Sequence, residues 1–455
     1  MSYLPHNQEK SQPSPALIRK ATIGAAVGSV VEWFDVAVYG YLAATIGQVF
    51  FAISDPTVAL LSSFAVFGAA FVVRPLGGLY FGMLGDRIGR QKTLAAVLLL
   101  VSAATFGIGI VPGYASIGIL APILLVLLRL LQGFSAGGEL GGASAFVAEY
   151  APPKRRGYLV SFVEMGAIAG FLLGSVVVLT LNFSLSQHDL LEWGWRIPFL
   201  LAAPMGLVGL FIRNKLEETP EFEALRSSGK VLKNPLKQTI THHWKAVLVV
   251  GGFALFQNAA VYIILTFLAT HISSNLKYGA QIGSISSVIT MVAVCIVIPL
   301  TGALSDRIGR KKVLGTSCVA AIVLAYPLFV LMEQGSVAAI AGHVGLGIIL
   351  GIFLGPVLPA MNEMFSTEVR YGGFSLGYNL SASLFGGTAP FLVTLLIANT
   401  GITASPSFYI IAAALVTFFV LVATKETAPR ILESRAKARE SAGAGTPVLE
   451  GRETA

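Results

Sequence analysis

Charged residues are scarce in this sequence, and their shortage excludes a large soluble protein. Asp, Glu, Lys and Arg together make up 12% of the 455 residues, whereas hydrophobic residues make up 55%. The mean hydropathy is +0.76. So few charges cannot cover the surface of a soluble protein of this length. The composition therefore predicts an integral membrane protein.

Cysteine and the common catalytic motifs are also missing or nearly so. The two cysteines, Cys295 and Cys318, lie in apolar runs without other metal-ligand residues nearby, so we expect neither disulfides nor a metal site. The phosphate-binding loop G-x-x-x-x-G-K-[ST] does not occur, which disfavours an ATP-driven pump. Ser, His and acidic residues do not cluster at a shared depth, which disfavours a membrane enzyme. We expect no catalytic residues and no cofactor.

Positive charge exceeds negative charge, with 31 Lys and Arg against 23 Asp and Glu and a formal net charge of +8. Only Arg74, Arg129, Arg196 and Lys277 fall within apolar segments or on the far side of the membrane; the remaining 27 (31 − 4) lie in alternate loops or near the termini. Lys and Arg accumulate on the cytoplasmic side of membrane proteins. We therefore expect no nucleic-acid partner, but a multi-pass protein of the cell (inner or plasma) membrane with both termini in the cytoplasm.

Twelve apolar segments are long enough to cross a bilayer, which takes about 20 residues. They fall into two groups of six, separated by the longest polar segment. The prediction is an all-α membrane protein with a cytoplasmic segment at 1–20, a six-helix bundle at 21–213, a cytoplasmic linker at 214–243, a second six-helix bundle at 244–424 and a cytoplasmic tail at 425–455. The tail is polar and lacks an apolar repeat, so we expect it to be disordered.

A charged turn occurs once in each half of the sequence. RPLGGLYFGMLGDRIGRQK at 74–92 has a near copy, GALSDRIGRKK at 302–312, which places Asp86 and Asp306 220 residues apart (306 − 86). LEETP at 216–220 is likewise echoed by KETAP at 425–429. Duplicated six-helix halves of this kind enclose a site near the middle of the membrane.

Several stretches resemble the major facilitator superfamily, and more closely its metabolite:proton symporter branch. They are EWFD at 32–35, RPLGG at 74–78, GDRIGR at 85–90, RLLQGFSAGGE at 129–139, AEYAPPKRRG at 148–157, WGWRIPF at 193–199 and LEETPEF at 216–222. Within that branch, FVEMGAIAGFLLG at 162–174 and EWGWRIPFLLAAPMGLVGL at 192–210 look most like the proline and betaine transporters. The resemblance implies two pseudo-symmetric six-helix bundles, the major facilitator fold. Osmosensing members of that group usually carry a long charged coiled-coil tail, which this sequence does not show, so we do not expect osmotic gating by such a tail.

Six ionisable residues fall inside apolar segments, where an ionised group costs about 2.5 to 3.5 kcal/mol on insertion scales. They are Glu32, Asp35, Arg74, Arg129, Glu139 and Glu164. We hypothesise that Asp35 and Glu32 carry the proton with Arg129 and Arg74 as partners, because burial favours a protonated carboxyl group and a nearby Arg favours an ionised one. Glu139 either takes part in coupling or binds a cationic group, and Glu164 either contacts substrate or forms a gating pair. The alternative is that all are static ion pairs that hold helices in register.

The repeated charged turn is interpreted as a cytoplasmic gate, because an Asp at a helix boundary can accept backbone N–H bonds and pair with Arg on a neighbouring span. The superfamily resemblance supports this interpretation, and a purely topogenic role is the alternative. The predicted gate residues are Asp86, Arg87, Arg90, Glu149, Arg156, Asp306, Arg307, Arg310, Glu363 and Arg370.

Polar and aromatic side chains in otherwise apolar segments are the candidate substrate contacts. An aromatic cage would suit a quaternary ammonium group, although an isolated aromatic residue in a span also packs against lipid or another helix. The predicted substrate-binding residues are Trp33, Tyr39, Arg74, Glu139, Glu164, Gln257, Asn258, Tyr262 and Asn379.

The function predicted from these features is secondary transport by a monomer: uptake of a small polar metabolite with protons, by alternating access. A channel is disfavoured because a permanently open pore has no use for a duplicated latch. The resemblance favours a zwitterionic compatible solute such as proline or glycine betaine. An organic acid such as citrate, 2-oxoglutarate or shikimate is the alternative, because Arg74 and Arg196 could bind a carboxylate of either class.

Overall fold

The computed structural model describes residues 13–51 and 56–434, and every regular element in that part of the chain is helical. Twelve helices are long and apolar enough to cross a membrane. The expected disorder of the tail concerns residues that, from 435 onward, lie outside the described part. The residue boundaries of the bundles, linker and tail remain a prediction.

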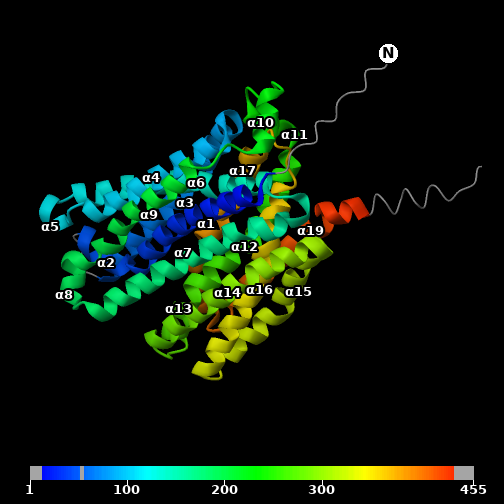
Figure 1. The fold of residues 1–455 in the computed structure, drawn as a ribbon. Helices are drawn as coiled ribbons and strands as arrows, with labels where there is room; N and C mark the ends of the chain where they lie inside the picture. Colours follow the sequence, from blue (N-terminus) through cyan, green and yellow to red (C-terminus); the bar gives the residue numbers. More distant parts are fainter. Residues whose placement is uncertain (1–12, 52–55, 435–455) are drawn as a thin grey trace, which may run out of the picture.

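The first six spans form an N-terminal bundle (Figure 1). Its first helix begins earlier than the sequence suggests, because Ser14 accepts a hydrogen bond from the Leu17 N–H and caps the helix ahead of Pro15. The helices of this bundle are α1 (Pro15–Tyr41), α2 (Ala43–Phe50), α3 (Pro56–Ile88), α4 (Arg90–Ile110), α5 (Tyr114–Ile117), α6 (Leu120–Tyr150), α7 (Arg156–Ser184), α8 (Gln187–Asp189) and α9 (Arg196–Asn214).

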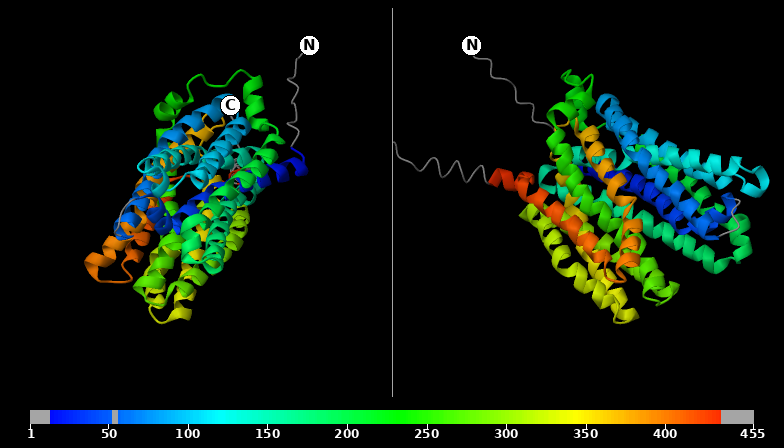
Figure 2. Two further views of the ribbon diagram at one scale, coloured as in Figure 1. Left: turned by 90° about the vertical axis from the view of Figure 1, so that its left-hand side faces the viewer. Right: turned by 180° about the vertical axis from the view of Figure 1, so that it is seen from behind.

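The last six spans form a C-terminal bundle beside the first (Figure 2). Two of its spans contain a π-helical turn near the middle, at Ile263–Phe267 and at Ala382–Gly386. The helices of this bundle are α12 (Trp244–Tyr262), α13 (Leu268–Thr270), α14 (Ala280–Ile308), α15 (Arg310–Met332), α16 (Ser336–Asn362), α17 (Arg370–Ser381), α18 (Ala389–Thr400) and α19 (Pro406–Ala423).

Two short helices, α10 (Pro220–Ser227) and α11 (Pro235–His242), connect the bundles. They lie at one end of the molecule, where α1 begins and α19 ends (Figures 1 and 2). We call this end the linker side and the opposite end the far side. The repeated charged turns lie on the linker side, because each connects the end of one span to the start of the next at this end.

Each repeated turn depends on a glycine with a positive φ. Gly89, between α3 and α4, has a φ of +114°, and Gly309, between α14 and α15, has a φ of +106°. Residues with a Cβ rarely adopt these angles. The two glycines thus allow a nearly immediate reversal from one span to the next, with the same geometry in both bundles.

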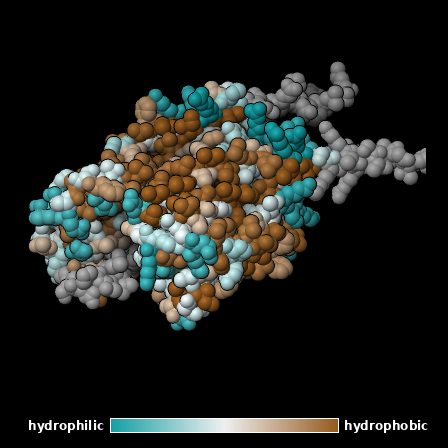
Figure 3. All heavy atoms as spheres, turned by 90° about the horizontal axis from the view of Figure 1, so that it is seen from below, coloured by the Kyte–Doolittle hydropathy of each residue, from teal (hydrophilic) through white to brown (hydrophobic). Residues whose placement is uncertain are grey.

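Small residues let α3 and α6 approach closely where the polar residues lie. A Cβ on Gly133 would overlap the Ala70 carbonyl group, and a Cβ on Gly137 would overlap the carbonyl group of Arg74. The two bundles meet chiefly where α3 packs on α17 and where α7 packs on α14. The outer surface carries many exposed apolar side chains, and Figure 3 shows a broad hydrophobic area across one face with hydrophilic residues toward its ends. This distribution fits a molecule whose middle lies in lipid.

Candidate functional site

A small cavity lies inside the N-terminal bundle, among α1, α3, α4 and α6. Its polar lining consists of Glu32, Asp35, Arg74, Arg129 and Gln132, and the rest of the lining is apolar or small. All five polar side chains are buried. The structure therefore brings together four of the residues that the sequence predicts for proton coupling. The roles of these residues remain predictions.

Asp35 is held by a network inside the N-terminal bundle. It accepts a hydrogen bond of 2.7 Å from Gln132 Nε2, and its other carboxylate oxygen lies 3.6 Å from Arg129 Nη1. Gln132 accepts a 2.9 Å bond from Arg129 and donates a 2.7 Å bond to Thr105 Oγ1. The Arg129 guanidinium lies over the Tyr39 ring, 4.1 Å from its centroid. Tyr39, a predicted substrate residue, thus supports Arg129 and does not line the cavity.

Arg74 stands at the boundary between the bundles. Its Nη2 lies 3.4 Å from Glu32 Oε1, and its guanidinium carbon lies 4.7 Å from the Phe71 ring centroid and 5.6 Å from that of Trp33. Tyr262, from the C-terminal bundle, meets Phe71 edge-on at 5.5 Å. Glu32 Oε2, Trp33 Nε1 and the Tyr262 hydroxyl are buried and have no hydrogen-bond partner among the described residues. Unpartnered buried polar groups are rare in folded proteins, so these three atoms are available to a ligand.

Glu164 and Gln257 join the two bundles. Gln257 Nε2, on α12, donates a 2.6 Å hydrogen bond to Glu164 Oε1 on α7. The neighbouring Asn258 is turned toward α17, where its side-chain oxygen accepts a 3.4 Å bond from the Tyr378 hydroxyl. Of these predicted substrate residues, Glu164 and Gln257 therefore lie at the bundle boundary.

Glu139 and Asn379, also predicted substrate residues, are already engaged by protein groups. Glu139 forms a buried ion pair with Arg213 of α9, and Arg213 also donates a 2.6 Å bond to the Leu94 carbonyl oxygen. Asn379 Nδ2 donates a 2.7 Å bond to the Gly137 carbonyl oxygen and so joins α17 to α6. The sequence offers no sign of Arg213, because an arginine in the last turn of a span has the ordinary position of a topogenic charge.

Two aspartates cap helices of the opposite bundle on the linker side. Asp86, near the end of α3, accepts hydrogen bonds from the N–H groups of Tyr371 (3.3 Å) and Gly372 (2.8 Å) in the first turn of α17. Asp306, near the end of α14, accepts equivalent bonds of 2.8 and 2.9 Å in the first turn of α7. A carboxylate at a helix N-terminus satisfies free N–H groups and the positive end of the helix dipole. The repeated turn thus closes the linker side twice, in the same way.

Ion pairs surround both caps. Arg90 lies 3.1 Å from Asp86 and 3.2 Å from Glu149, and Glu149 lies 3.1 Å from Arg370 of the other bundle. In the second copy, Arg310 lies 2.8 Å from Asp306 and 3.2 Å from Glu363. The exposed predicted gate residues, Arg87 and Arg307, form no ion pair within the described residues.

Helix α10 enters this closure through Glu221, which the sequence prediction missed. Glu221 lies 2.7 Å from Arg370 and 3.5 Å from Arg156, and so joins one arginine from each bundle. It also accepts a 2.8 Å bond from Thr367 Oγ1. Burial alone would raise the pKa of Glu221, but Arg370, with help from Thr367 and Arg156, holds that pKa below its ordinary value.

The echoed segments LEETP and KETAP supply a further pair of caps. Glu218 accepts hydrogen bonds from the first two N–H groups of α4, at 3.0 and 3.2 Å. Glu426 does the same for α15, at 2.9 and 3.2 Å. Burial raises the pKa of Glu218, and the hydrogen bonds to its carboxylate act in the opposite direction. The echo itself was the signal for these caps, since both copies keep Glu followed by Thr.

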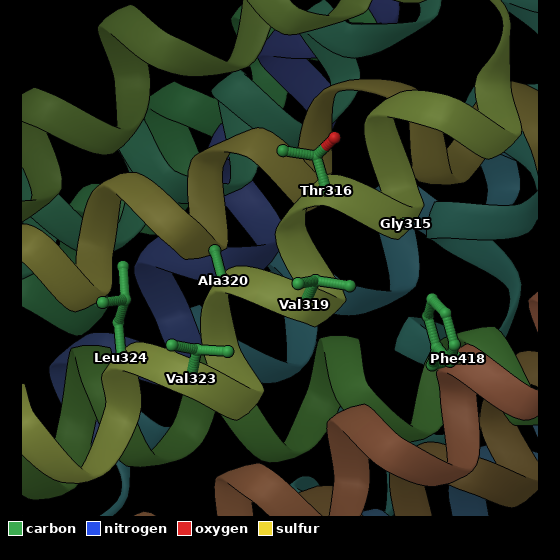
Figure 4. A pocket seen from close by; sticks show the side chains of 7 residues that line it. All are labelled: Gly315, Thr316, Val319, Ala320, Val323, Leu324 and Phe418. Atoms are coloured by element: carbon green, nitrogen blue, oxygen red, sulfur yellow. The ribbon is translucent and has the colours of Figure 1, made fainter.

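A groove on the outer surface is unrelated to these polar residues. It lies on the outer surface between α15 and α19 and is lined by Gly315, Thr316, Val319, Ala320, Val323, Leu324 and Phe418 (Figure 4). Nearly all of this lining is apolar, and it belongs to the face that meets lipid. In the part of the chain that the structure describes, no group of three or more His, Cys, Asp or Glu side chains could hold a metal ion.

Known proteins match this chain over nearly its whole length. The family model for sugar (and other) transporters matches residues 21–230, and that of the major facilitator superfamily matches residues 252–452. The proline/betaine transporter of Salmonella typhimurium is 40% identical over 429 residues, covering 91% of this chain and 85% of the relative. The glycine betaine/proline/ectoine/pipecolic acid transporter OusA of Dickeya dadantii is 38% identical over 443 residues, covering 95% and 88%.

Solved structures show the same fold. The proton:xylose symporter XylE bound to 6-bromo-6-deoxy-D-glucose superposes with a TM-score of 0.75 at 18% identity, covering 90% of this chain and 95% of that one. A partially occluded inward-open form of XylE from E. coli gives a TM-score of 0.71 at 20% identity, covering 90% and 99%. These matches confirm the predicted fold of twelve helices in two six-helix bundles. The chain is a membrane transporter and belongs to the major facilitator superfamily.

Proposed function

We propose that the protein imports a zwitterionic compatible solute of the proline or glycine betaine class together with protons, by alternating access. The observation that carries the proposal is the cluster at Arg74, where an arginine, an acid and unpartnered polar atoms meet aromatic rings at the bundle boundary. Relatives at 38 to 40% identity are named as transporters of such solutes, which supports this class over an organic acid.

The carboxylate of the substrate binds at Arg74 in this proposal. The guanidinium group offers a planar fork of N–H donors that suits a carboxylate, and its single contact with Glu32, at 3.4 Å, is long. Trp33 Nε1 and the Tyr262 hydroxyl supply further donors from both bundles. A ligand bound by both bundles favours the state in which they approach each other around it.

The proton binds at Asp35 and Glu32. Burial disfavours an ionised carboxylate, whereas Arg129 and Arg74 favour it. Movement of either arginine away from its acid therefore promotes protonation, and its return promotes release. Substrate bound at Arg74 competes with Glu32 for the same guanidinium group, so substrate binding and protonation of Glu32 favour each other. This mutual dependence is the physical basis of symport.

The caps at Asp86 and Asp306 form the gate on the linker side in this proposal. The hydrogen bonds and ion pairs that join the bundles in the described residues run from the linker side to about the middle of the spans. Such a closure corresponds to a state whose access is toward the far side. Separation of the caps then opens the opposite route.

We infer that the linker side faces the cytoplasm of a bacterial-type inner or plasma membrane. The positive-inside distribution of Lys and Arg supports this orientation, and the apolar outer face fits a lipid bilayer. The polar cluster is built within one chain, which supports function as a monomer.

Counterflow in proteoliposomes tests the proposed substrate class without assuming the coupling ion. Vesicles loaded with one unlabelled candidate, drawn from proline, glycine betaine, citrate, 2-oxoglutarate and shikimate, are mixed with traces of the same labelled compound. We expect proline or glycine betaine to exchange. Uptake driven by an imposed pH gradient, and its collapse with a protonophore, tests the coupling. Exchange of the organic acids alone would overturn the substrate class.

A further inference from the structure

Glu164 is the one buried acid that has no arginine partner among the described residues. Its side chain has 3% relative exposure. Each of the other buried acids in this part of the chain has an arginine nitrogen within 3.6 Å. An ionised Glu164 would therefore be a buried charge without a counter-charge, which is costly inside a membrane protein. The buried acids with arginine partners are Glu32, Asp35, Asp86, Glu139, Glu149 and Asp306.

The contact between Glu164 and Gln257 is matched to a protonated acid. Gln257 Nε2 donates a 2.6 Å hydrogen bond to Glu164 Oε1, whereas Gln257 Oε1 is buried and has no hydrogen-bond partner among the described residues. Buried polar atoms usually have a partner, and an ionised carboxylate can only accept hydrogen bonds. A protonated carboxyl group has an O–H to donate. An acid and an amide can then pair through two hydrogen bonds, one in each direction.

Glu164 lies between the cluster at Glu32 and the caps on the linker side. Helix α7 runs beside α1 with Gly166 against the Ala26 carbonyl group. This register places Glu164 roughly two helical turns, or about 11 Å, nearer the linker side than Glu32. In the other direction, Glu164 is about 10 Å along α7 from Gly157, whose N–H group is capped by the opposite bundle. Its position therefore suits a role in closure of the linker side.

The titratable groups that approach Glu164 from neighbouring helices are neutral. Tyr378 of α17 is within electrostatic range of Glu164, and its hydroxyl donates to Asn258. Cys295 of α14 lies 3.9 Å from the carbonyl oxygen of Met165, the next residue of α7. Other titratable groups on helices packed against α7 have partners of their own: Glu32 with Arg74, Asp35 with Arg129, Glu139 with Arg213, Glu149 with Arg90 and Arg370, Asp306 with Arg310, and His343 with Ser286 and the Ile264 carbonyl oxygen.

We propose that Glu164 holds a proton while the linker side is closed and releases it to that side when the bundles separate. This assignment rests on the proposed alternating access and adds a protonation site apart from Asp35 and Glu32. The neutral pair of Glu164 and Gln257 joins α7 to α12 in the closed state. On opening, water that enters from the linker side accepts the proton and hydrates the carboxylate. On closing, the proton is taken back from the same side, so it does not cross the membrane.

The direction of the pH effect follows from this exchange. The hydrated carboxylate of the open state binds a proton as an ordinary glutamate does, whereas the dry, uncompensated site of the closed state favours the protonated form. Protonation and closure therefore favour each other. The contribution of Glu164 to closure is present at low pH and is lost as pH rises.

Infrared spectra of the purified full chain in proteoliposomes test whether Glu164 is protonated. A protonated carboxyl group has a C=O stretching band that an ionised carboxylate lacks. At about pH 7.5, we expect Glu164→Gln to lack one such band that the wild type has. The control is Glu192→Gln, the same change at an exposed residue in the turn Leu190–Gly194, which should keep the band. In Gln257→Leu the band should shift in frequency, because the carboxyl group loses its amide partner.

Spin labels at Lys92 and Lys312, exposed residues of α4 and α15, test the link between this proton and closure. Between about pH 7.5 and about pH 9, we expect the ratio of closed to open wild-type molecules to fall by up to about tenfold per pH unit. Glu164→Gln should stay closed over this range, because an amide has no such proton to lose and can form both hydrogen bonds with Gln257. Glu192→Gln should respond as the wild type does.

Two results would overturn this assignment. If the wild type has no band that Glu164→Gln lacks at about pH 7.5, Glu164 is ionised in the closed state. If the label distances of both proteins respond equally to pH, the proton has no link to closure. Should Glu164→Gln fail to fold, as judged by its thermal unfolding midpoint, the band shift in Gln257→Leu and the pH response of the wild type decide.

Failure of the proposed function gives different results. A wild-type protein that exchanges neither proline nor glycine betaine contradicts the proposed substrate class and leaves the proton on Glu164 standing. A label distance that changes with neither pH nor substrate removes the linker-side gate, and the role of Glu164 in closure with it.

Discussion

Asp35 and Glu32 lie one turn apart on α1, yet they have different surroundings. Asp35 is fixed by Gln132 and Arg129 within one bundle. Glu32 has a single long contact and one unpartnered oxygen at the boundary between bundles. In the proposed mechanism, the second acid shares Arg74 with the substrate and the first does not. Two acids of the same helix would then have two tasks, exchange with substrate and proton storage.

Replacement of Asp35 by Asn should abolish uptake driven by a pH gradient while it spares exchange. The amide keeps the hydrogen bond with Gln132 but cannot bind and release a proton. We expect the accumulation ratio in proteoliposomes to fall to unity and the exchange rate to stay within about threefold of wild type. The control is Glu192→Gln, which removes an exposed carboxylate in the turn Leu190–Gly194 and should leave both values unaltered. Accumulation that still follows the imposed pH gradient in the Asn variant would remove Asp35 from the coupling mechanism.

Replacement of only one partner in the Glu139–Arg213 pair should destabilise the protein strongly. An uncompensated charge then stays buried, at a cost of about 3–5 kcal/mol. We expect the thermal unfolding midpoint in detergent to fall for Glu139→Gln and for Arg213→Met. The double variant should unfold at a higher temperature than either single one, because both charges are gone. Single variants as stable as the wild type would show that the two side chains do not form a buried pair.

The sequence alone predicts the charges in the middle of spans and names Arg129 and Arg74 as partners of Asp35 and Glu32, but it does not reveal the pair of Glu139 and Arg213. The acids and arginines in the middle of apolar segments could be identified because charge is rare there. Gln132 escaped notice because a neutral amide raises no such signal, and Arg213 because it lies at a helix end. Pairing depends on which helix faces meet, and apolar segments without a clear polar face do not encode that.

Helix ends of the two bundles are joined by the same kind of cap, which occurs twice. Asp86 caps α17 and Asp306 caps α7, so each bundle provides the cap and receives one. Glu218 and Glu426 then cap the helices that follow the two aspartates. The repeated charged turn led to the prediction of a gate at these aspartates. The LEETP and KETAP echo marks the caps by Glu218 and Glu426, which the sequence analysis did not predict. The π-helical turns had no signal, because an apolar run has the same composition in either helix type.

Replacement of Asp86 by Asn, or of Asp306 by Asn, should loosen the linker side. An amide oxygen still accepts N–H bonds but loses the charge that favours the helix N-terminus and its arginine. Spin labels at Lys92 and Lys312, exposed residues in the equivalent helices α4 and α15, report the separation of the bundles by pulsed electron resonance. We expect a longer mean distance in each variant and the longest in the double variant. Distances equal to that of the doubly labelled parent would argue against a gate at these residues.

The whole molecule is less symmetric than its two halves, because a single linker helix serves both. Glu221 of α10 contacts Arg156 of one bundle and Arg370 of the other. The equivalent residues at the end of KETAP and after it, 429–434, are also helical, but none of them forms an ion pair with another described residue. The contacts on the linker side therefore consist of two equivalent sets of caps and one additional bridge through Glu221.

The bridge through Glu221 should withstand mild acid. Its pKa is held below the ordinary value of 4.5, so the ionised form and its contribution to closure are present above that value and are lost only as pH falls through the lower pKa of the closed state. We expect the Glu221→Gln variant to give a longer Lys92–Lys312 label distance than the wild type, by the same amount at about pH 7.5 and about pH 5.5. A difference between variant and wild type that disappears at the lower pH would contradict the assignment.

In the proposed mechanism, the capped helix ends set a condition on how the linker side opens. When Asp86 and Asp306 move away, four backbone N–H groups, at Tyr371, Gly372, Gly157 and Tyr158, lose their acceptors together. Buried N–H groups without an acceptor are costly, so water must replace the two carboxylates as their acceptor. Separation of the bundles and entry of water between them are therefore one event, and the barrier to opening includes the hydration of two helix ends.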